Sequence, residues 1–332
     1  MALLEVENLS ITLRTHRAEV AAVRGVSFTL ERGGTLGLIG ESGSGKSLTA
    51  LALMGLLPDN ALATGSLRLQ GQELLGQSEA QWCQLRGNRL AMVFQEPMTA
   101  LNPVHPIGRQ VAEPLRRHLR LDAASAQRQA LALLERVGIP RAAERLGDYP
   151  HQFSGGQRQR IMIAMALACQ PDVLIADEPT TALDVTVQQQ ILDLMADLVA
   201  ERGMGLVLIS HDLGVVSQNV DQMMVMYGGS VVERGPTEAL FAHMAHPYTR
   251  GLLAARPQLH TGRLPDGSMP PLPTISGTVP DLANLPAGCA FSNRCSYAQA
   301  ACHSQVPAPV AQDTGGLHWA RCLHPSATGA LQ

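Results

Sequence analysis

The only lysine of this chain lies in a glycine-rich loop. The sequence has 25 lysine and arginine residues, and Lys46 is the one lysine among them. It belongs to a run that fits G-x-x-x-x-G-K-[ST] and consists of Gly40, Glu41, Ser42, Gly43, Ser44, Gly45, Lys46 and Ser47. Backbone N–H groups of such a loop can surround phosphate oxygens, and a flexible ammonium can lie between those oxygens. The run therefore predicts a nucleotide-phosphate site, with the Ser47 hydroxyl as a ligand of Mg²⁺.

Two adjacent carboxylates follow a short apolar run later in the chain. Residues 173–176 are apolar and lead directly into Asp177 and Glu178. Ligands of open α/β sheets bind beyond the carboxyl ends of the strands, which is where this pair would lie. We expect Asp177 to hold Mg²⁺ together with Ser47. We expect Glu178 to orient or deprotonate an attacking water.

A second phosphate-facing helix start is predicted at residues 153–157. Phe153 is followed by Ser154, Gly155, Gly156 and Gln157, and an apolar helical stretch comes next. A helix N-terminus with small residues can bind an anion through its backbone N–H groups. One nucleotide bound by one chain has no use for two such cradles. The pattern therefore favours a head-to-tail pair of subunits in which each completes the site of the other.

Strands alternate with helices in the segments that would position these residues. We expect strands at 36–39, 173–177 and 206–210, and helices at 46–57 and 187–199. Gly203 follows the second helix as a stop signal. This alternation is typical of a parallel sheet covered by helices on both faces.

Composition changes twice along the chain. The stretch of about 97–170 reads as mostly helical, and we interpret it as an insertion into an α/β nucleotide-binding domain that spans 1–256. Residues 257–288 contain seven prolines, which favours an extended linker. The segment 257–332 is therefore predicted to be a linker followed by a small cysteine-bearing region.

Charge and hydropathy narrow the classes of partner. The net charge is −3, and we find no long basic run, so a nucleic-acid partner is not implied. No 18-residue apolar stretch and no signal peptide are found. We expect a soluble cytosolic protein whose membrane association comes through a partner.

Four of the six cysteines fall in the last 44 residues of the chain. These four are Cys289, Cys295, Cys302 and Cys322. Clustered cysteines of a cytosolic chain favour metal over disulfides, but the close pairs of structural zinc sites are missing, and an iron–sulfur cluster suits the spacing about as well. Simple thiols also stay open, and His303, His318 and His324 are substitute ligands. We interpret Cys83 and Cys169 as small apolar residues.

Together, these motifs resemble the ATP-binding subunits of ABC transporters. Residues 40–47 look like the Walker A motif, 173–178 like Walker B, and 153–157 like the family signature with Phe153 in place of leucine. The resemblance implies an ATPase with a P-loop (RecA-like) α/β core. It also implies an antiparallel β subdomain, a helical insertion and a small cysteine-bearing C-terminal extension.

The resemblance also implies roles for further residues. Gln95 resembles the Q-loop glutamine, which would join Ser47 and Asp177 at Mg²⁺. Asp184 resembles the D-loop aspartate of the nucleotide site. His211 resembles the switch histidine, which would act in catalysis with Glu178 and Gln95.

The adenine contact departs from the family pattern. The family stacks the base on an aromatic residue before the second strand, whereas this chain has no Phe, Tyr or Trp before Phe28. His16 or Arg17 occupies about that place, and either planar group could stack on a base.

Three segments narrow the resemblance to the dipeptide, oligopeptide and nickel importers. They are residues 95–103, 177–188 and 246–249, and the tail from Gly288 agrees with them. This branch implies two permeases, a periplasmic solute-binding protein and a second ATPase subunit, more often a paralogue than a second copy. It also implies a place at the cytoplasmic face of the bacterial inner membrane and a [4Fe–4S] cluster, with zinc as the alternative, in the tail.

The alternative is an ABC ATPase that acts on nucleic acid or ribosomes. A DNA-repair or chromosome ATPase with such a head would need a long coiled-coil insertion. Lys46 and Ser154 are only 108 positions apart, which leaves no room for one. A ribosome-acting relative normally carries two heads, and this chain has one set of motifs.

Overall fold

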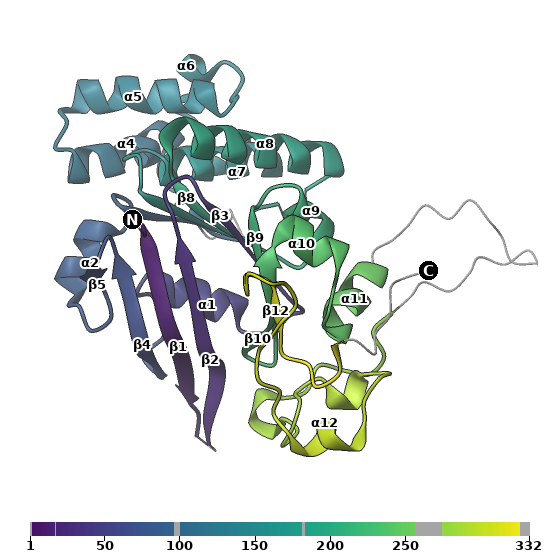
Figure 1. Cartoon of the computed structure of the whole chain (residues 1–332). Helices are drawn as coiled ribbons and strands as arrows, with labels where there is room; N and C mark the ends of the chain where they lie inside the picture. The colour runs from purple at the N-terminus through teal and green to yellow at the C-terminus, as the bar shows by residue number, and fades with distance from the viewer. Residues whose placement is uncertain (1, 17, 96–99, 181–182, 256–273, 326–332) are drawn as a thin grey trace, which may run out of the picture.

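The computed structural model describes residues 2–16, 18–95, 100–180, 183–255 and 274–325. Two sheets lie in it, with helices packed around them (Figure 1). None of the helices in this part of the chain has the length and apolar character needed to span a bilayer. The predicted α/β class is confirmed.

The smaller sheet is antiparallel and comes mainly from the N-terminal segment. Its order is β2 (Glu19–Leu30), β1 (Leu4–Arg14), β4 (Ala61–Leu69) and β5 (Gln72–Glu73). Alternate side chains of a strand face opposite sides of a sheet, and the buried side chains of β1 pack with those of β2 and β4 on one face. This sheet forms the wall beside α1 (Lys46–Leu53) (Figure 1).

The larger sheet carries the motif-bearing strands at its centre. Its order is β11 (Val310–Ala311), β12 (Trp319–Ala320), β10 (Ser230–Pro236), β9 (Gln222–Tyr227), β3 (Thr35–Ile39), β8 (Gly205–Ser210), β7 (Val173–Asp177) and β6 (Leu90–Val93). The strands from β9 to β6 run parallel, so their carboxyl ends meet at one edge. Every residue of β7 and β8 is buried, which is typical of strands covered on both faces.

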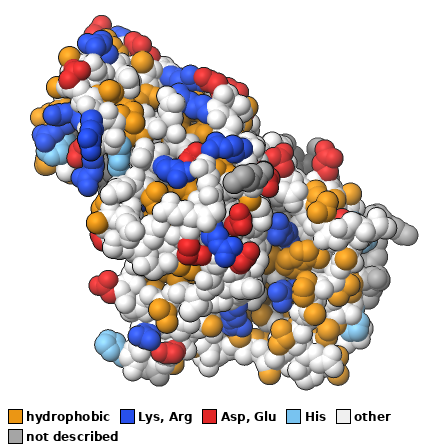
Figure 2. All heavy atoms as spheres, turned by 60° about the vertical axis from the view of Figure 1, so that its left-hand side comes forward, with side chains coloured by type: hydrophobic (Ala, Val, Ile, Leu, Met, Phe, Trp, Pro, Cys, Tyr) orange, Lys and Arg blue, Asp and Glu red, His pale blue; other side chains and the backbone are white. Residues whose placement is uncertain are grey.

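A helical region lies between β6 and β7, in the stretch for which the sequence predicts an insertion. It comprises α4 (Ile107–His118), α5 (Ala123–Arg136), α6 (Ala142–Arg145) and α7 (Gly155–Ala166). Burial of Ala126, Ala130 and Leu134 at every fourth position gives α5 one apolar stripe that packs on its neighbours. Basic side chains gather at one end of this region (Figure 2), where α4 ends in Arg116, Arg117 and His118.

The predicted end of the first helix is wrong. The chain pattern predicts a helix as far as Leu57, whereas α1 ends at Leu53. Gly55 takes the left-handed region with φ +61°, and a Cβ there would lie 2.3 Å from the Trp82 ring, so the chain turns early to let α2 (Glu79–Leu85) pack closely. In contrast, α8 (Val185–Arg202) ends at Gly203 as predicted, with φ +59°.

The described C-terminal part of the chain adds six further short helices. They are α9 (Leu213–Ser217), α10 (Thr237–Ala242), α11 (Pro247–Ala254) and, in the tail, α12 (Ala300–Ser304) and the 3-10 turns Leu282–Asn284 and Ser292–Arg294. The tail extends the sheet because β12 pairs with β10. Most of the predicted linker lies outside the described residues.

A buried polar contact fastens the tail to the sheet. Nε2 of His318 lies 2.9 Å from Oε1 of Glu233 on β10, and the exposed fractions of the two side chains are 3% and 0%. The same carboxylate accepts hydrogen bonds from the N–H groups of Ala245 and His246. A buried carboxylate needs such partners, so the tail and the start of α11 are held at one point.

Candidate functional site

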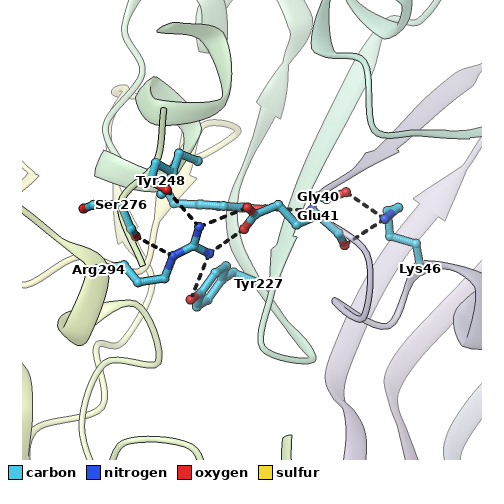
Figure 3. Close-up of polar contacts among 8 residues, drawn as sticks. Gly40, Glu41, Lys46, Tyr227, Tyr248, Ser276 and Arg294 are labelled. Atoms are coloured by element: carbon cyan, nitrogen blue, oxygen red, sulfur yellow. Dashed lines mark hydrogen bonds and ion pairs between the residues drawn. The ribbon is translucent and has the colours of Figure 1, made fainter. Parts of the chain in front are cut away.

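The glycine loop joins β3 to α1 and encloses the Lys46 side chain. Nζ of Lys46 donates hydrogen bonds to the carbonyl oxygens of Gly40 at 2.7 Å and Glu41 at 3.0 Å (Figure 3). The residue is 6% exposed. Burial lowers the pKa of Lys46, while the nearby carboxylates of Glu178, Asp177 and Glu41 oppose that shift. The ammonium is therefore held beside the acidic pair, where the sequence predicts phosphate.

Two glycines of the loop are required by close packing. A Cβ on Gly40 would lie 2.3 Å from the carbonyl oxygen of Met226, on the neighbouring strand β9. Gly45 has φ +102°, and a Cβ there would lie 2.9 Å from the carbonyl oxygen of Ala22. The loop therefore passes between two backbones at distances that only glycine allows.

Ser47 and Asp177 come together from different elements, as expected for a shared metal. Asp177 ends β7 and is 6% exposed. Burial raises the pKa of Asp177, and a hydrogen bond from the Ser47 side chain opposes the rise. Oδ1 of Asp177 and Oγ of Ser44 are buried and have no hydrogen-bond partner among the described residues. These unsatisfied oxygens and the carboxylate–hydroxyl pair fit a divalent cation bound with an anionic ligand.

Three predicted catalytic residues meet at one carboxylate oxygen. Nε2 of Gln95 donates to Oε2 of Glu178 at 3.1 Å, and Nδ1 of His211 lies 3.3 Å from the same oxygen. Gln95, Glu178 and His211 follow β6, β7 and β8, which are neighbours in the sheet. The parallel strand order is what brings side chains from three distant parts of the chain together.

The backbone of Glu178 takes an unusual conformation that the sequence did not reveal. Its φ is +48°, in the left-handed region, and its N–H donates to the carbonyl oxygen of Ile209 at 2.9 Å. A non-glycine residue in this region is uncommon and is often found at functional sites. The turn directs the chain out of the sheet directly after the acidic pair.

The second predicted phosphate cradle begins α7. Oγ of Ser154 accepts from the Gln157 N–H at 3.3 Å, and Oε1 of Gln157 accepts from the Ser154 N–H at 3.1 Å, which is a capping box. Gly155 follows Ser154, and a Cβ on Gly156 would lie 2.8 Å from the Val187 side chain. Within the described ranges, no hydrogen bond or ion pair joins these residues to the glycine loop. The two predicted cradles are therefore not joined by such a contact in the described part of the chain.

The remaining predicted nucleotide contacts are Asp184 and the planar side chain at His16 or Arg17. Asp184 caps α8, and its Oδ1 accepts from the Val187 N–H at 3.1 Å. His16 is exposed and lies in the turn between β1 and β2. Arg17 lies outside the described residues.

The structure adds three residues to the site that the sequence did not single out. Arg294 and Tyr248 contact Glu41 of the glycine loop, and Tyr227 contacts Arg294 (Figure 3). Tyr248 belongs to a segment typical of the importer branch, which was the only available signal for it. Arg294 directly precedes Cys295 in the tail.

The four tail cysteines line one small pocket together with His246, Phe291 and His324. Burial raises the pKa of Cys289 to about 11 and also raises those of Cys295 and Cys322, with neighbouring cysteines adding to each rise. Nevertheless, no group of three or more His, Cys, Asp or Glu in the described part of the chain is arranged to hold a metal ion. Neither zinc nor an iron–sulfur cluster therefore gains support from the arrangement of the described residues.

The other predicted ligands and thiols lie elsewhere. His318 contacts Glu233 rather than the cysteines, and His303 is exposed on α12. Cys169 is buried, and burial raises its pKa to about 11, as expected for a small apolar residue. Cys83 donates a hydrogen bond to Glu79.

Comparison with known proteins separates the chain into two matched segments. Residues 23–181 match the family model described as ABC transporter, and residues 232–302 match the one described as oligopeptide/dipeptide transporter, C-terminal region. A protein of Brucella abortus named as a peptide import ATP-binding protein is 51% identical over 95% of this chain and 92% of that protein. A second such protein of Brucella abortus is 48% identical over 97% of this chain and 96% of that protein.

Solved structures agree on the fold. The ATP-binding cassette MJ0796, in a post-hydrolysis state bound to ADP and Pi, is 25% identical, with a TM-score of 0.64 over 70% of this chain and 98% of that chain. The cassette cbiO1 of Clostridium perfringens, part of an ABC transporter complex, is 25% identical, with a TM-score of 0.62 over 73% of this chain and 92% of that chain. The predicted P-loop core is confirmed.

The role of the Glu178 carboxylate can be tested with Glu178→Gln. The amide keeps the shape of the side chain but cannot accept a proton, so MgATP should still bind while hydrolysis falls by roughly 10²–10⁴-fold. Binding is measured by calorimetry and hydrolysis by phosphate release. Glu144→Gln, on the exposed helix α6, should hydrolyse ATP like the unchanged protein. Full turnover in Glu178→Gln would remove this carboxylate from the catalytic role.

Proposed function

The chain belongs to the family of ATP-binding subunits of ABC transporters and is an ATPase, and we propose that it powers the uptake of di- or oligopeptides through a bacterial importer. The structural observation that most directly supports ATP hydrolysis is a cluster of side chains at one edge of the larger sheet. The cluster consists of Lys46, Asp177, Glu178, Gln95 and His211. The relatives named for peptide import support the solute class. A related small solute such as nickel is the second candidate within this branch.

The residues of the site divide the work of hydrolysis. The loop amides and Lys46 would hold the phosphates, and Ser47, Asp177 and Gln95 would hold the metal. Mg²⁺ supplies charge neutralisation for phosphoryl transfer when it is bound. Glu178 and His211 hold the attacking water in line with the bond that breaks.

A second ATPase subunit would complete the site. Ser154, Gly155, Gly156 and Gln157 form a capped helix start that can face phosphate. Within the described ranges they make no hydrogen bond or ion pair with the glycine loop of their own chain. In a head-to-tail pair they would face the γ-phosphate of the partner, and Asp184 would lie at the same junction. We favour a paralogue over a second copy.

The permease would dock in a groove next to Gln95. This groove has a volume of about 490 Å³ and lies between the α/β core and the helical region. Met92, Phe94, Met162 and Met165 give it an adaptable apolar lining, and Phe94 is 38% exposed. Phe94 lines the groove and directly precedes Gln95 in the chain. A shift of Gln95 in the nucleotide site would therefore also move Phe94 against a bound permease helix.

The same partners would set the location of the protein. Two permeases would hold it at the cytoplasmic face of the bacterial inner membrane, and a periplasmic solute-binding protein would deliver the solute to them. The alternative of an ATPase acting on nucleic acid or ribosomes is not favoured, because the net charge is −3 and the relatives are transport proteins.

For the tail we propose a [4Fe–4S] cluster held by Cys289, Cys295, Cys302 and Cys322. A polynuclear cluster is held by thiolates spread around its faces, whereas a single ion needs them to converge on one point. The proposal is supported only by the presence of all four cysteines around one pocket. The cluster would cross-link the four cysteines and so stabilise the tail, whose apolar core is small.

An absorbance spectrum tests the cluster. Protein purified without oxygen should show broad visible absorbance that dithionite bleaches, with roughly four irons per chain. Cys302→Ser should lose this absorbance, whereas Cys83→Ser, far along the chain, should keep it. Zinc without visible absorbance would contradict the proposal.

Uptake by the assembled transporter tests the function. Lys46→Ala removes the ammonium that binds phosphate, so ATP hydrolysis and the uptake of labelled di- and tripeptides should both fall to background. The unchanged transporter should take up peptide only when ATP is supplied. Peptide uptake that persists in Lys46→Ala would contradict the coupling, and uptake of nickel alone would move the solute to the second candidate.

A further inference from the structure

The C-terminal tail contacts the glycine loop through an ion pair that spans most of the chain. Nη1 and Nη2 of Arg294 donate to the two carboxylate oxygens of Glu41 at 2.6 and 3.0 Å (Figure 3). The exposed fractions of the side chains are 5% for Arg294 and 28% for Glu41. A two-point contact of this kind fixes direction as well as distance, and exclusion of water strengthens it.

Contacts other than the one with Glu41 also hold the Arg294 side chain in place. Its Nε donates to the carbonyl oxygen of Ser276 at 3.0 Å, and its Nη1 lies 3.4 Å from the Tyr227 hydroxyl. The guanidinium lies 5.8 Å from the centre of the Tyr227 ring and 6.0 Å from that of Phe291. The side chain therefore has little freedom to lose when it binds Glu41.

A second contact reaches the backbone of the same loop residue. The Glu41 N–H donates to the hydroxyl of Tyr248 at 2.8 Å. The Tyr248 ring packs against Tyr227, with centroids 4.7 Å apart, and against Phe291 of the tail at 5.4 Å. Tail residues thus support both the hydrogen bond to the backbone and the ion pair to the side chain.

Every polar group of Glu41 is in use. Its N–H binds Tyr248, its carboxylate binds Arg294, and its carbonyl oxygen accepts from Nζ of Lys46. The position of the phosphate-binding ammonium is therefore linked to the tail through one residue. The ion pair also balances a negative charge that would otherwise lie beside an anionic ligand.

We propose that Arg294 is a positioning residue for the nucleotide site: by binding Glu41, the C-terminal tail holds the glycine loop in its phosphate-binding form. The inference rests on the proposed nucleotide site and adds a regulatory route to it. Any change that loosens the tail would weaken nucleotide binding without touching the reacting atoms.

A double-mutant cycle on the full chain tests the link. Calorimetry with MgATP is carried out on Arg294→Gln, Glu41→Gln and the double variant. Arg294→Gln should weaken binding roughly tenfold, a size typical of coupled sites. The double variant should bind no more weakly than Arg294→Gln alone, because both changes break the same contact. In the assembled transporter, Arg294→Gln should raise the KM for ATP and leave kcat unchanged.

Two further variants separate positioning from a general loss of tail structure. Arg321→Gln is the matched control, because Arg321 also directly precedes a tail cysteine. It lies over Trp319 and, among the described residues, makes no hydrogen bond or ion pair with the glycine loop. It should bind MgATP like the unchanged protein. Arg294→Lys keeps the charge without the two-point geometry and should lose less affinity than Arg294→Gln. It also serves if Arg294→Gln does not fold.

Three results would overturn the inference. They are unchanged affinity in both Arg294 variants, additive losses in the double variant, and an equal loss in Arg321→Gln. Failure of the unchanged protein to bind MgATP would instead contradict the proposed function.

Discussion

The buried ammonium of Lys46 is the interaction on which the site depends. Two carbonyl oxygens of its own loop accept hydrogen bonds from it. Burial lowers the pKa of Lys46, and the charges of three nearby carboxylates oppose that shift. The loop can enclose it only because glycines pass between the backbones of β9 and β2. The position of the Lys46 side chain therefore depends on the loop geometry, on the nearby charges and on the packing between the two sheets.

The strand order of the larger sheet brings the other site residues together. Strands β8, β7 and β6 are parallel neighbours, so residues that follow them share one edge even though 116 positions separate Gln95 from His211. The tail reaches the same edge through Arg294, and α11 reaches it through Tyr248. Both the Glu178 carboxylate and the glycine loop are thus fixed by contacts between residues that are distant in sequence.

The sequence predicted the features that are local or periodic. The glycine loop, the acidic pair after an apolar run, the capped start of α7 and the stop at Gly203 all follow from short-range rules. The end of α1 was predicted four residues too late, because the packing of Trp82 against Gly55 decides it. The pair between Glu41 and Arg294 could not be predicted, since tail packing brings together residues 253 positions apart and no local pattern marks them.

Chemical labelling of the single lysine tests the central claim most directly. An acyl-phosphate ATP probe transfers its label to an amine held beside the phosphates, and mass spectrometry locates the label on a chain with one lysine side chain. Labelling should occur at Lys46, and excess MgATP should prevent it. A label at Lys46 that forms equally with and without competing MgATP, or no label there at all, would contradict the account.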